Sequence, residues 1–172
     1  MATLLILGGL PGTGKTTLAR ALARELGAVH LRIDSIELAI RESGVTVVSL
    51  DDAGYRVAYA VAEDNLHLGR TVVADSVNPI PITRDAWRDV ATRAGCDAIE
   101  IEIACSDAGE HRRRVEDRLR GPGPPGGPTW QDVLERDYRP WEGVHITLDT
   151  AGHSLEESLA ALMAGLRSRG LG

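Results

Sequence analysis

The segment from Gly9 to Thr16, Gly-Leu-Pro-Gly-Thr-Gly-Lys-Thr, constrains the fold more than any other part of the chain. It matches the pattern G-x-x-x-x-G-K-S/T, the P-loop that cradles nucleotide phosphates. The apolar run at 4–7 precedes it and is typical of a buried strand, and residues 17–26 follow with helical periodicity. A strand, a glycine-rich loop and a helix in this order form the context in which the motif binds nucleotide.

Each residue type in this loop has a physical role. Glycines let successive backbone N–H groups point at phosphate oxygens, and the helix N-terminus adds partial positive charge. Lys15 can reach the β- and γ-phosphates, and the Thr16 hydroxyl can ligate Mg²⁺. Lys15 is the only lysine among 19 basic residues, so we expect it where a planar guanidinium does not fit. The residues predicted to bind ATP here are Gly9, Pro11, Gly12, Thr13, Gly14, Lys15, Thr16 and Thr17.

Composition limits the remaining function classes. A length of 172 residues with 43% apolar content predicts one globular domain covering residues 1–172. The net charge of -6 argues against a broad surface for nucleic acid. Two cysteines are too few for a disulfide framework, and no stretch reaches the roughly 18 apolar residues that span a bilayer. Residues 1–3 carry no charged leader, so we expect a cytoplasmic protein without membrane contact.

Strand and helix patterns alternate along the chain. Strands are predicted at 29–33, 71–75, 98–104 and 144–149, and helices at 35–43, from 51 to 67, and at 83–94, 107–120, 130–138 and 154–169. The pattern does not decide between loop and short strand for 45–50, and the Gly/Pro run at 121–128 predicts a loop. Val57, Ala60 and Val61 are spaced for the buried face of their helix. This alternation predicts an α/β fold, with a five-stranded parallel sheet covered by helices on both faces.

The whole chain resembles the small P-loop kinases, above all the group of zeta toxins, chloramphenicol phosphotransferases and polynucleotide kinases. The resemblance rests on the P-loop, on acids ending the second and third strands, and on an arginine-rich helix before the Gly/Pro segment. The stretches 110–118, 128–130 and 138–141 also resemble predicted kinases called AAA family ATPases. The resemblance to the small P-loop kinases implies a single P-loop domain that uses ATP and Mg²⁺, with a small arginine-rich lid at about residues 107–140.

Two carboxylates are expected at the cleft. Asp34 ends the second strand, beside the P-loop in this fold, and the resemblance implies that it is the general base for an acceptor hydroxyl. The alternative is that Asp34 caps the following helix. Asp75 follows an apolar strand and has the form of the acid that holds Mg²⁺ with Thr16. It could instead contact substrate or belong to an ordinary turn.

Arginines of the predicted lid are the remaining catalytic candidates. Arg114 and Arg118 share one face of their helix, and the resemblance implies that such arginines clamp the phosphates. The adjacent Gly/Pro segment would serve as the hinge that closure needs. A solvated charged helix is the alternative. The resemblance also implies that the loop holding Thr150 and Gly152 runs past the adenine; an ordinary turn before Ser154 is equally compatible.

The predicted function is transfer of the γ-phosphoryl of ATP to a hydroxyl of a small molecule, such as an antibiotic, a sugar or a nucleoside. The alternatives are an acceptor-free ATPase or switch and a polynucleotide 5′-hydroxyl kinase. A GTPase motif Asn-Lys-x-Asp is impossible with a single lysine in the P-loop, and Asp75 lacks the following Glu of a motor. Phage polynucleotide kinase has an arginine three residues after its base, where this chain has Glu37, which favours a cationic or polyhydroxy acceptor. A monomer and a homodimer are both compatible with the sequence.

Overall fold

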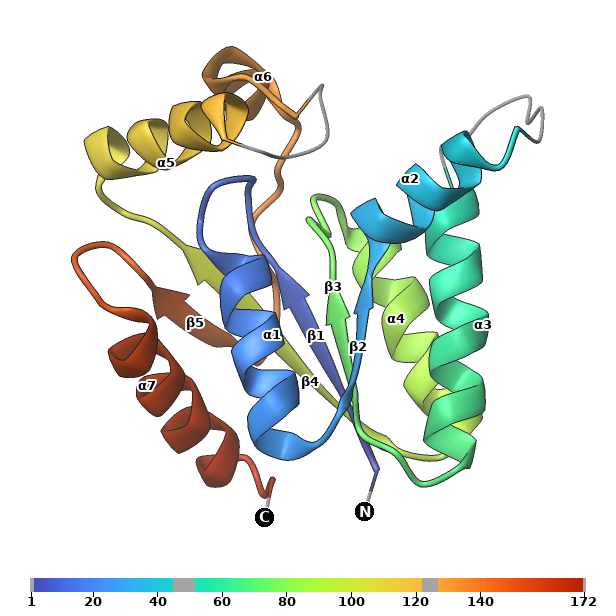
Figure 1. Cartoon of the computed structure of the whole chain (residues 1–172). Coiled ribbons are helices and arrows are strands. Elements are labelled where there is room, and N and C mark those ends of the chain that lie inside the picture. The colour runs from blue at the N-terminus through green and yellow to red at the C-terminus, as the bar shows by residue number, and fades with distance from the viewer. Residues whose placement is uncertain (1, 45–51, 122–126, 172) are drawn as a thin grey trace.

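The computed structural model describes residues 2–44, 52–121 and 127–171. Its centre is a parallel five-stranded sheet with the order β2-β3-β1-β4-β5 (Figure 1). The strands are β1 (Thr3–Gly8), β2 (Val29–Arg32), β3 (Val72–Asp75), β4 (Asp97–Ala104) and β5 (Ile146–Asp149). Because all strands are parallel, their carboxyl ends meet at one edge, where ligands bind in such sheets. The predicted α/β fold is confirmed.

Helices cover both faces of the sheet. The helices α1 (Lys15–Leu26) and α7 (Leu155–Ser168) lie on one face, and α3 (Ala53–His67) and α4 (Pro81–Ala94) lie on the other (Figure 1). Side chains of β1 alternate between the two cores: Leu5 and Leu7 join the first, and Leu4 and Ile6 the second. All four are fully buried, each worth roughly 1.5–3 kcal/mol. Burial on both faces explains why this strand reads as an unbroken apolar run.

Three further helices stand at the carboxyl edge of the sheet. They are α2 (Ile33–Glu42), α5 (Ala108–Arg120) and the short α6 (Trp130–Glu135). In Figure 1, α2 rises on one side of the P-loop, and α5 with α6 on the other. No helix in the described part of the chain has the length and apolar character needed to cross a membrane.

Several predicted boundaries were wrong. The strand expected to extend to 33 ends at Arg32, so Asp34 lies in the first turn of α2, where an acid complements the helix dipole. Pro81 takes the first position of α4, which tolerates proline, so that helix begins before 83. The helix predicted at 130–138 ends at Glu135, and the last strand begins at Ile146. The segment 45–50 and residues 122–126 of the predicted loop lie outside the described residues.

The predicted buried face of α3 was also wrong. Val57 and Val61 are 43% and 37% exposed, and Ala60 is exposed as well. The helix instead buries Gly54, Ala58, Ala62 and Leu66. Small residues allow close approach: a Cβ added at Gly54 would lie 2.5 Å from Cγ of Glu37 on α2. The buried face of α3 therefore depends on the small size of its residues, and a pattern of hydrophobicity alone does not predict this.

Candidate active site

The P-loop has the backbone that its glycines permit. Gly9, Gly12 and Gly14 have φ values of 145°, 87° and 87°, a region that other residues rarely enter. A Cβ at Gly9 would lie 2.2 Å from the carbonyl oxygen of Ile103, and one at Gly12 would lie 2.4 Å from Cγ2 of Val115. Both conformation and space therefore require glycine at these two positions.

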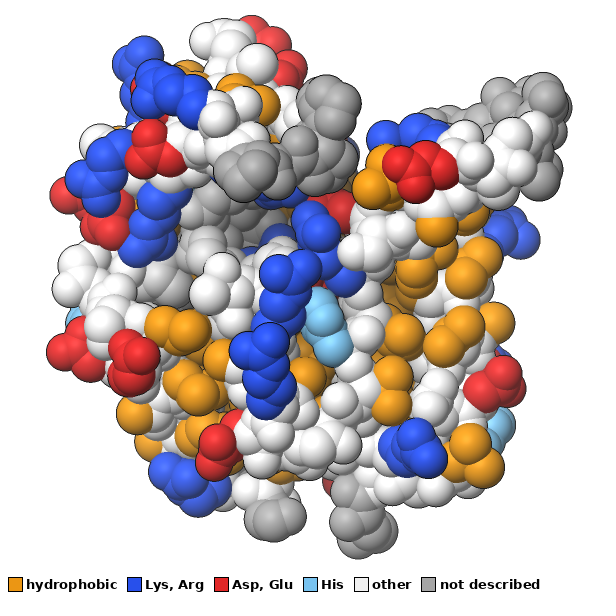
Figure 2. Space-filling view, viewed as in Figure 1, with side chains coloured by type: hydrophobic (Ala, Val, Ile, Leu, Met, Phe, Trp, Pro, Cys, Tyr) orange, Lys and Arg blue, Asp and Glu red, His pale blue; other side chains and the backbone are white. Residues whose placement is uncertain are grey.

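A cavity of about 520 Å³ opens beside this loop, a size typical of small-molecule sites. In Figure 2 the molecule is hollowed beneath α5 and α6, and basic side chains gather around the hollow. The lining residues are Leu10, Pro11, Gly12, Gly14, Lys15, Thr16, Thr17, Leu18, Arg20, Arg32, Arg114, Arg118, Thr150, His153, Ser154, Leu155 and Ser158. Of the residues predicted to bind ATP, Gly9, Thr13 and Gly152 do not line it. Gly9 and Thr13 are buried, and the N–H of Gly152 donates to Glu110.

Asp75, at the end of β3, is the centre of a buried polar cluster. Its Oδ1 lies 3.6 Å from Nζ of Lys15 and accepts a 3.3 Å hydrogen bond from the Thr16 hydroxyl. Its Oδ2 lies 3.2 Å from Nε2 of His30, a contact that sequence reasoning missed. Burial raises the pKa of Asp75, but the His30 hydrogen bond and the Lys15 charge outweigh it, so the pKa lies below its usual range. An ionised carboxylate beside a threonine hydroxyl is an oxygen donor set that fits Mg²⁺.

Asp34 lies between two arginines of the cavity wall. Nη2 of Arg32 donates to its Oδ2 at 2.6 Å, and Nη2 of Arg118 lies 3.7 Å from the same oxygen. The side chain of Asp34 is 53% exposed and does not itself line the cavity. It does not cap α2, because Arg32 holds the N-cap position and no side chain caps the helix. The contact with Arg118 joins α2 to α5 across the hollow.

The first half of the predicted lid is fastened to the P-loop. Nε2 of His111 donates to the carbonyl oxygen of Pro11 at 2.7 Å, and Val115 packs on Gly12. Both side chains are buried, so the middle of α5 rests directly on the loop. The charged-helix alternative therefore describes only the outer face of α5.

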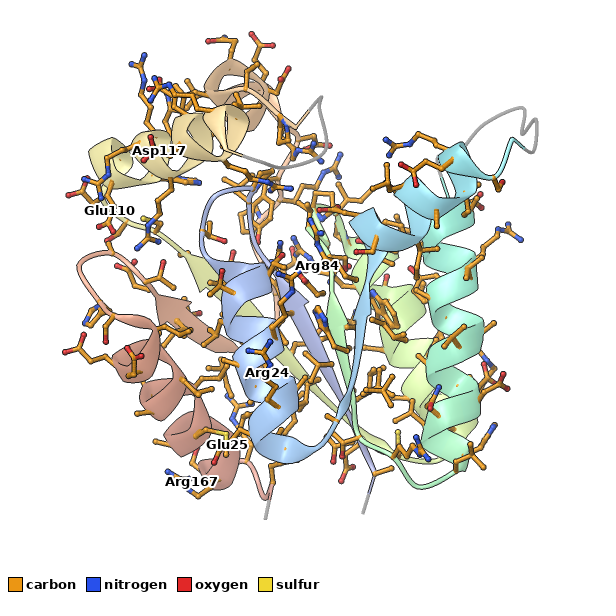
Figure 3. All side chains as sticks on the ribbon, viewed as in Figure 1. Arg24, Glu25, Arg84, Glu110, Asp117 and Arg167 are labelled. Atoms are coloured by element: carbon orange, nitrogen blue, oxygen red, sulfur yellow. The ribbon has the colours of Figure 1, made fainter. Side chains whose placement is uncertain are left out.

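Arg114 fastens α5 to a second segment. Its guanidinium donates to Glu110 at 2.6 Å and to the hydroxyl and carbonyl of Thr150 at 2.8 and 3.0 Å. The Thr150 hydroxyl in turn donates to the carbonyl of Thr13 at 2.7 Å. Figure 3 shows Glu110 where α5 meets the loop between β5 and α7. The loop predicted to pass the adenine is thus tied to the P-loop through a buried threonine.

A buried arginine, Arg84, fastens the loop after β3 to residues 139–140. Arg84 lies inside the molecule (Figure 3) and donates to four backbone carbonyls, those of Asn78, Pro79, Arg139 and Pro140, at 2.9, 3.1, 2.5 and 2.8 Å. Its guanidinium also stacks 4.4 Å from the Trp141 ring, which packs against Gly8. These bonds hold the β3–α4 loop, in which Asn78 has a φ of 49°. Asp75 immediately precedes this loop, so Arg84 also fixes the path of the chain after the predicted Mg²⁺ ligand.

The chain is similar in sequence to known proteins. A model of the AAA domain family matches residues 4–126. A shikimate kinase of Symbiobacterium thermophilum is 29% identical, covering 96% of this chain and 97% of that protein.

Solved structures show the same fold. The Mycobacterium tuberculosis APS kinase in complex with AMPPNP and APS has a TM-score of 0.71 at 19% identity, covering 96% of this chain and 98% of that chain. A gluconokinase of Sinorhizobium meliloti has a TM-score of 0.68 at 20% identity, covering 96% of this chain and 92% of that chain.

Proposed function

This chain belongs to the AAA domain family, and from that premise we propose that it is an ATP-dependent phosphotransferase acting on a hydroxyl group of a small molecule. One observation carries the proposal: Asp34 contacts Arg32 and Arg118, and Arg32 also lies 4.0 Å from Asp75, which contacts Lys15 and Thr16. That arrangement supports a role for the Asp34 carboxylate as proton acceptor near residues suited to phosphate and Mg²⁺. Relatives named shikimate kinase, APS kinase and gluconokinase support the same reaction class.

In the proposed reaction the acceptor oxygen bonds to the γ-phosphorus, the bond to the ADP oxygen breaks, and Asp34 receives the hydroxyl proton. Lys15 and the P-loop N–H groups hold the phosphates, and Arg118 neutralises charge that develops on the transferred group. Thr16 and Asp75 would hold Mg²⁺, which when bound neutralises the phosphate oxygens. Arg114 was predicted for the same task, but three of the five N–H donors of its guanidinium already bond to Glu110 and Thr150. Arg118 is therefore the stronger candidate.

The test measures Mg²⁺-dependent ATP turnover with a panel of hydroxyl acceptors, for wild type, Lys15→Ala and Asp34→Asn. We expect slow turnover without acceptor and at least about tenfold stimulation by one acceptor, since positioning supplies most of the rate. Asp34→Asn should lower the stimulated rate by about 10²–10⁴-fold. Asp64→Asn, an exposed acid on α3, is the matched control. Brisk hydrolysis without acceptor that survives Asp34→Asn would establish the acceptor-free ATPase instead.

A further inference from the structure

Arg32 lies between the two carboxylates of the site. It is the last residue of β2, and the register pairs it with Asp75, the last residue of β3. Its Nη2 donates to Asp34 at 2.6 Å, and its Nε lies 4.0 Å from Oδ2 of Asp75. One guanidinium therefore faces the proposed general base on one side and the proposed Mg²⁺ ligand on the other.

The Nε–H of Arg32 is a buried donor with an unfilled hydrogen bond. Among the residues that the structure describes, it has no hydrogen-bond partner. A buried donor without an acceptor costs about 1–3 kcal/mol, so the Nε–H of Arg32 favours an arrangement that gives it one. A movement of about 1 Å would bring it within hydrogen-bond distance of Asp75. The guanidinium would then join the two carboxylates directly.

The shape of the side chain matters here. Arginine presents donors in a rigid planar fork, whereas lysine offers a single ammonium on a flexible stem. Only the fork can direct Nη2 at Asp34 and Nε at Asp75 at the same time. Arg118 cannot replace it, because its guanidinium is 3.7 Å from Asp34 and about half exposed. Arg32 thus makes the closer contact with Asp34 of the two.

We propose that Arg32 is a positioning residue that holds Asp34 at a set distance from Asp75 during phosphoryl transfer. The proposal rests on the proposed function, in which Asp34 receives the acceptor proton. Misplacing a catalytic group by about 1 Å can lower the rate by about 10²-fold, so the guanidinium fork would act on kcat more than on ATP binding.

The experiment is a double-mutant cycle between Arg32→Lys and Asp34→Asn, with transfer to the stimulating acceptor measured at steady state. We expect Arg32→Lys to lower kcat at least about tenfold while the KM for ATP changes less than about threefold. In the Asp34→Asn background the same change should alter the rate less than about twofold, because the group being positioned is gone. Arg56→Lys, an exposed arginine paired with Asp52, is the matched control.

The outcomes separate the two proposals. No acceptor-stimulated turnover in the wild type overturns both. Normal transfer by Arg32→Lys, or equal effects of that change with and without Asp34, overturns the role of Arg32 alone. Arg32→Met, which keeps the aliphatic stem, and urea denaturation of both variants check folding. If both variants lose the folded state, Arg32 is structural and the proposal is wrong.

Discussion

At Gly8, the substitution Gly8→Ala should create a steric conflict with Trp141, and a second substitution, Trp141→Leu, should relieve it. It ends β1, and a Cβ added there would lie 2.2 Å from Cζ2 and 2.9 Å from Cη2 of Trp141. Gly8 is not among the positive-φ glycines, so the substitution Gly8→Ala is a question of space alone. Carbon atoms in contact are about 3.5–4.0 Å apart, so the methyl group would be too close by about 1.3 Å.

Trp141 is not free to move by that amount. Its indole N–H donates to the hydroxyl of Tyr138 at 2.8 Å, and its ring carries the guanidinium of Arg84. Overpacking costs about 1–3 kcal/mol, and losing the indole hydrogen bond would add about 1 kcal/mol. We therefore expect Gly8→Ala to lower the free energy of unfolding by about 2–4 kcal/mol.

Urea denaturation followed by circular dichroism measures this change as a lower midpoint at constant m-value. Trp141→Leu removes the ring atoms that would collide with the methyl group added by Gly8→Ala. Its effect on the free energy of unfolding should therefore be at least about 1 kcal/mol smaller in the Gly8→Ala background than in the wild type. Gly165→Ala, inside α7 with its nearest contact at 3.4 Å, is the control and should be neutral or stabilising. A midpoint for Gly8→Ala within error of wild type, or additive effects with Trp141→Leu, would refute the steric argument.

Three further predictions concern buried and charged groups. In urea denaturation, Trp87→Ala should lower the free energy of unfolding by about 3–5 kcal/mol. Trp87→Phe should lower it by less than about 1.5 kcal/mol, since the fully buried indole N–H has no hydrogen-bond partner to lose among the described residues. Thr150→Val should cost about 1–3 kcal/mol because the carbonyl of Thr13 loses its donor, while Thr150→Ser should stay closer to wild type; equal losses would contradict this. Hydrogen bonds from Ser106 hold the pKa of Asp149 below its usual range, so this carboxylate stabilises the fold above its unfolded pKa of about 3.9 and loses that effect as the pH falls through its lower folded value. The urea midpoints of wild type and Asp149→Asn should therefore differ at pH 7 and converge toward about pH 2, and a constant difference would count against the assignment.

Much of the fold follows from local patterns. The P-loop and its flanking strand and helix occupy one continuous stretch, and alternating strands and helices leave few arrangements other than a parallel sheet. Helix N-termini and prolines shift boundaries by a few residues, as Asp34 and Pro81 show. Hydrophobic periodicity predicted the wrong buried face for α3, because the close packing of this helix buries alanine and glycine and leaves the two valines exposed.

The site was predictable only where its residues are near in sequence or follow a strand. Lys15, Thr16 and Asp75 do come together, because the strand order places β3 beside β1. His30 and Arg32 were missed because their contacts with Asp75 depend on β2 pairing with β3, and no local pattern specifies that neighbour. For Arg32, the sequence offered one signal: it lies two residues before Asp34 and near the end of a predicted strand, which indicates a position close to the site.

A single lysine in the phosphate loop makes the chain unusual for chemical labelling. Lys15 is the only side-chain amine in the sequence, and it is 8% exposed beside Asp75. Amine-acylating reagents therefore have one side-chain target, Lys15. The extent of its acylation measures how accessible the P-loop is. Any acyl or ubiquitin group attached to a lysine of this protein would sit where the phosphates are expected, so lysine tagging and nucleotide binding should exclude each other.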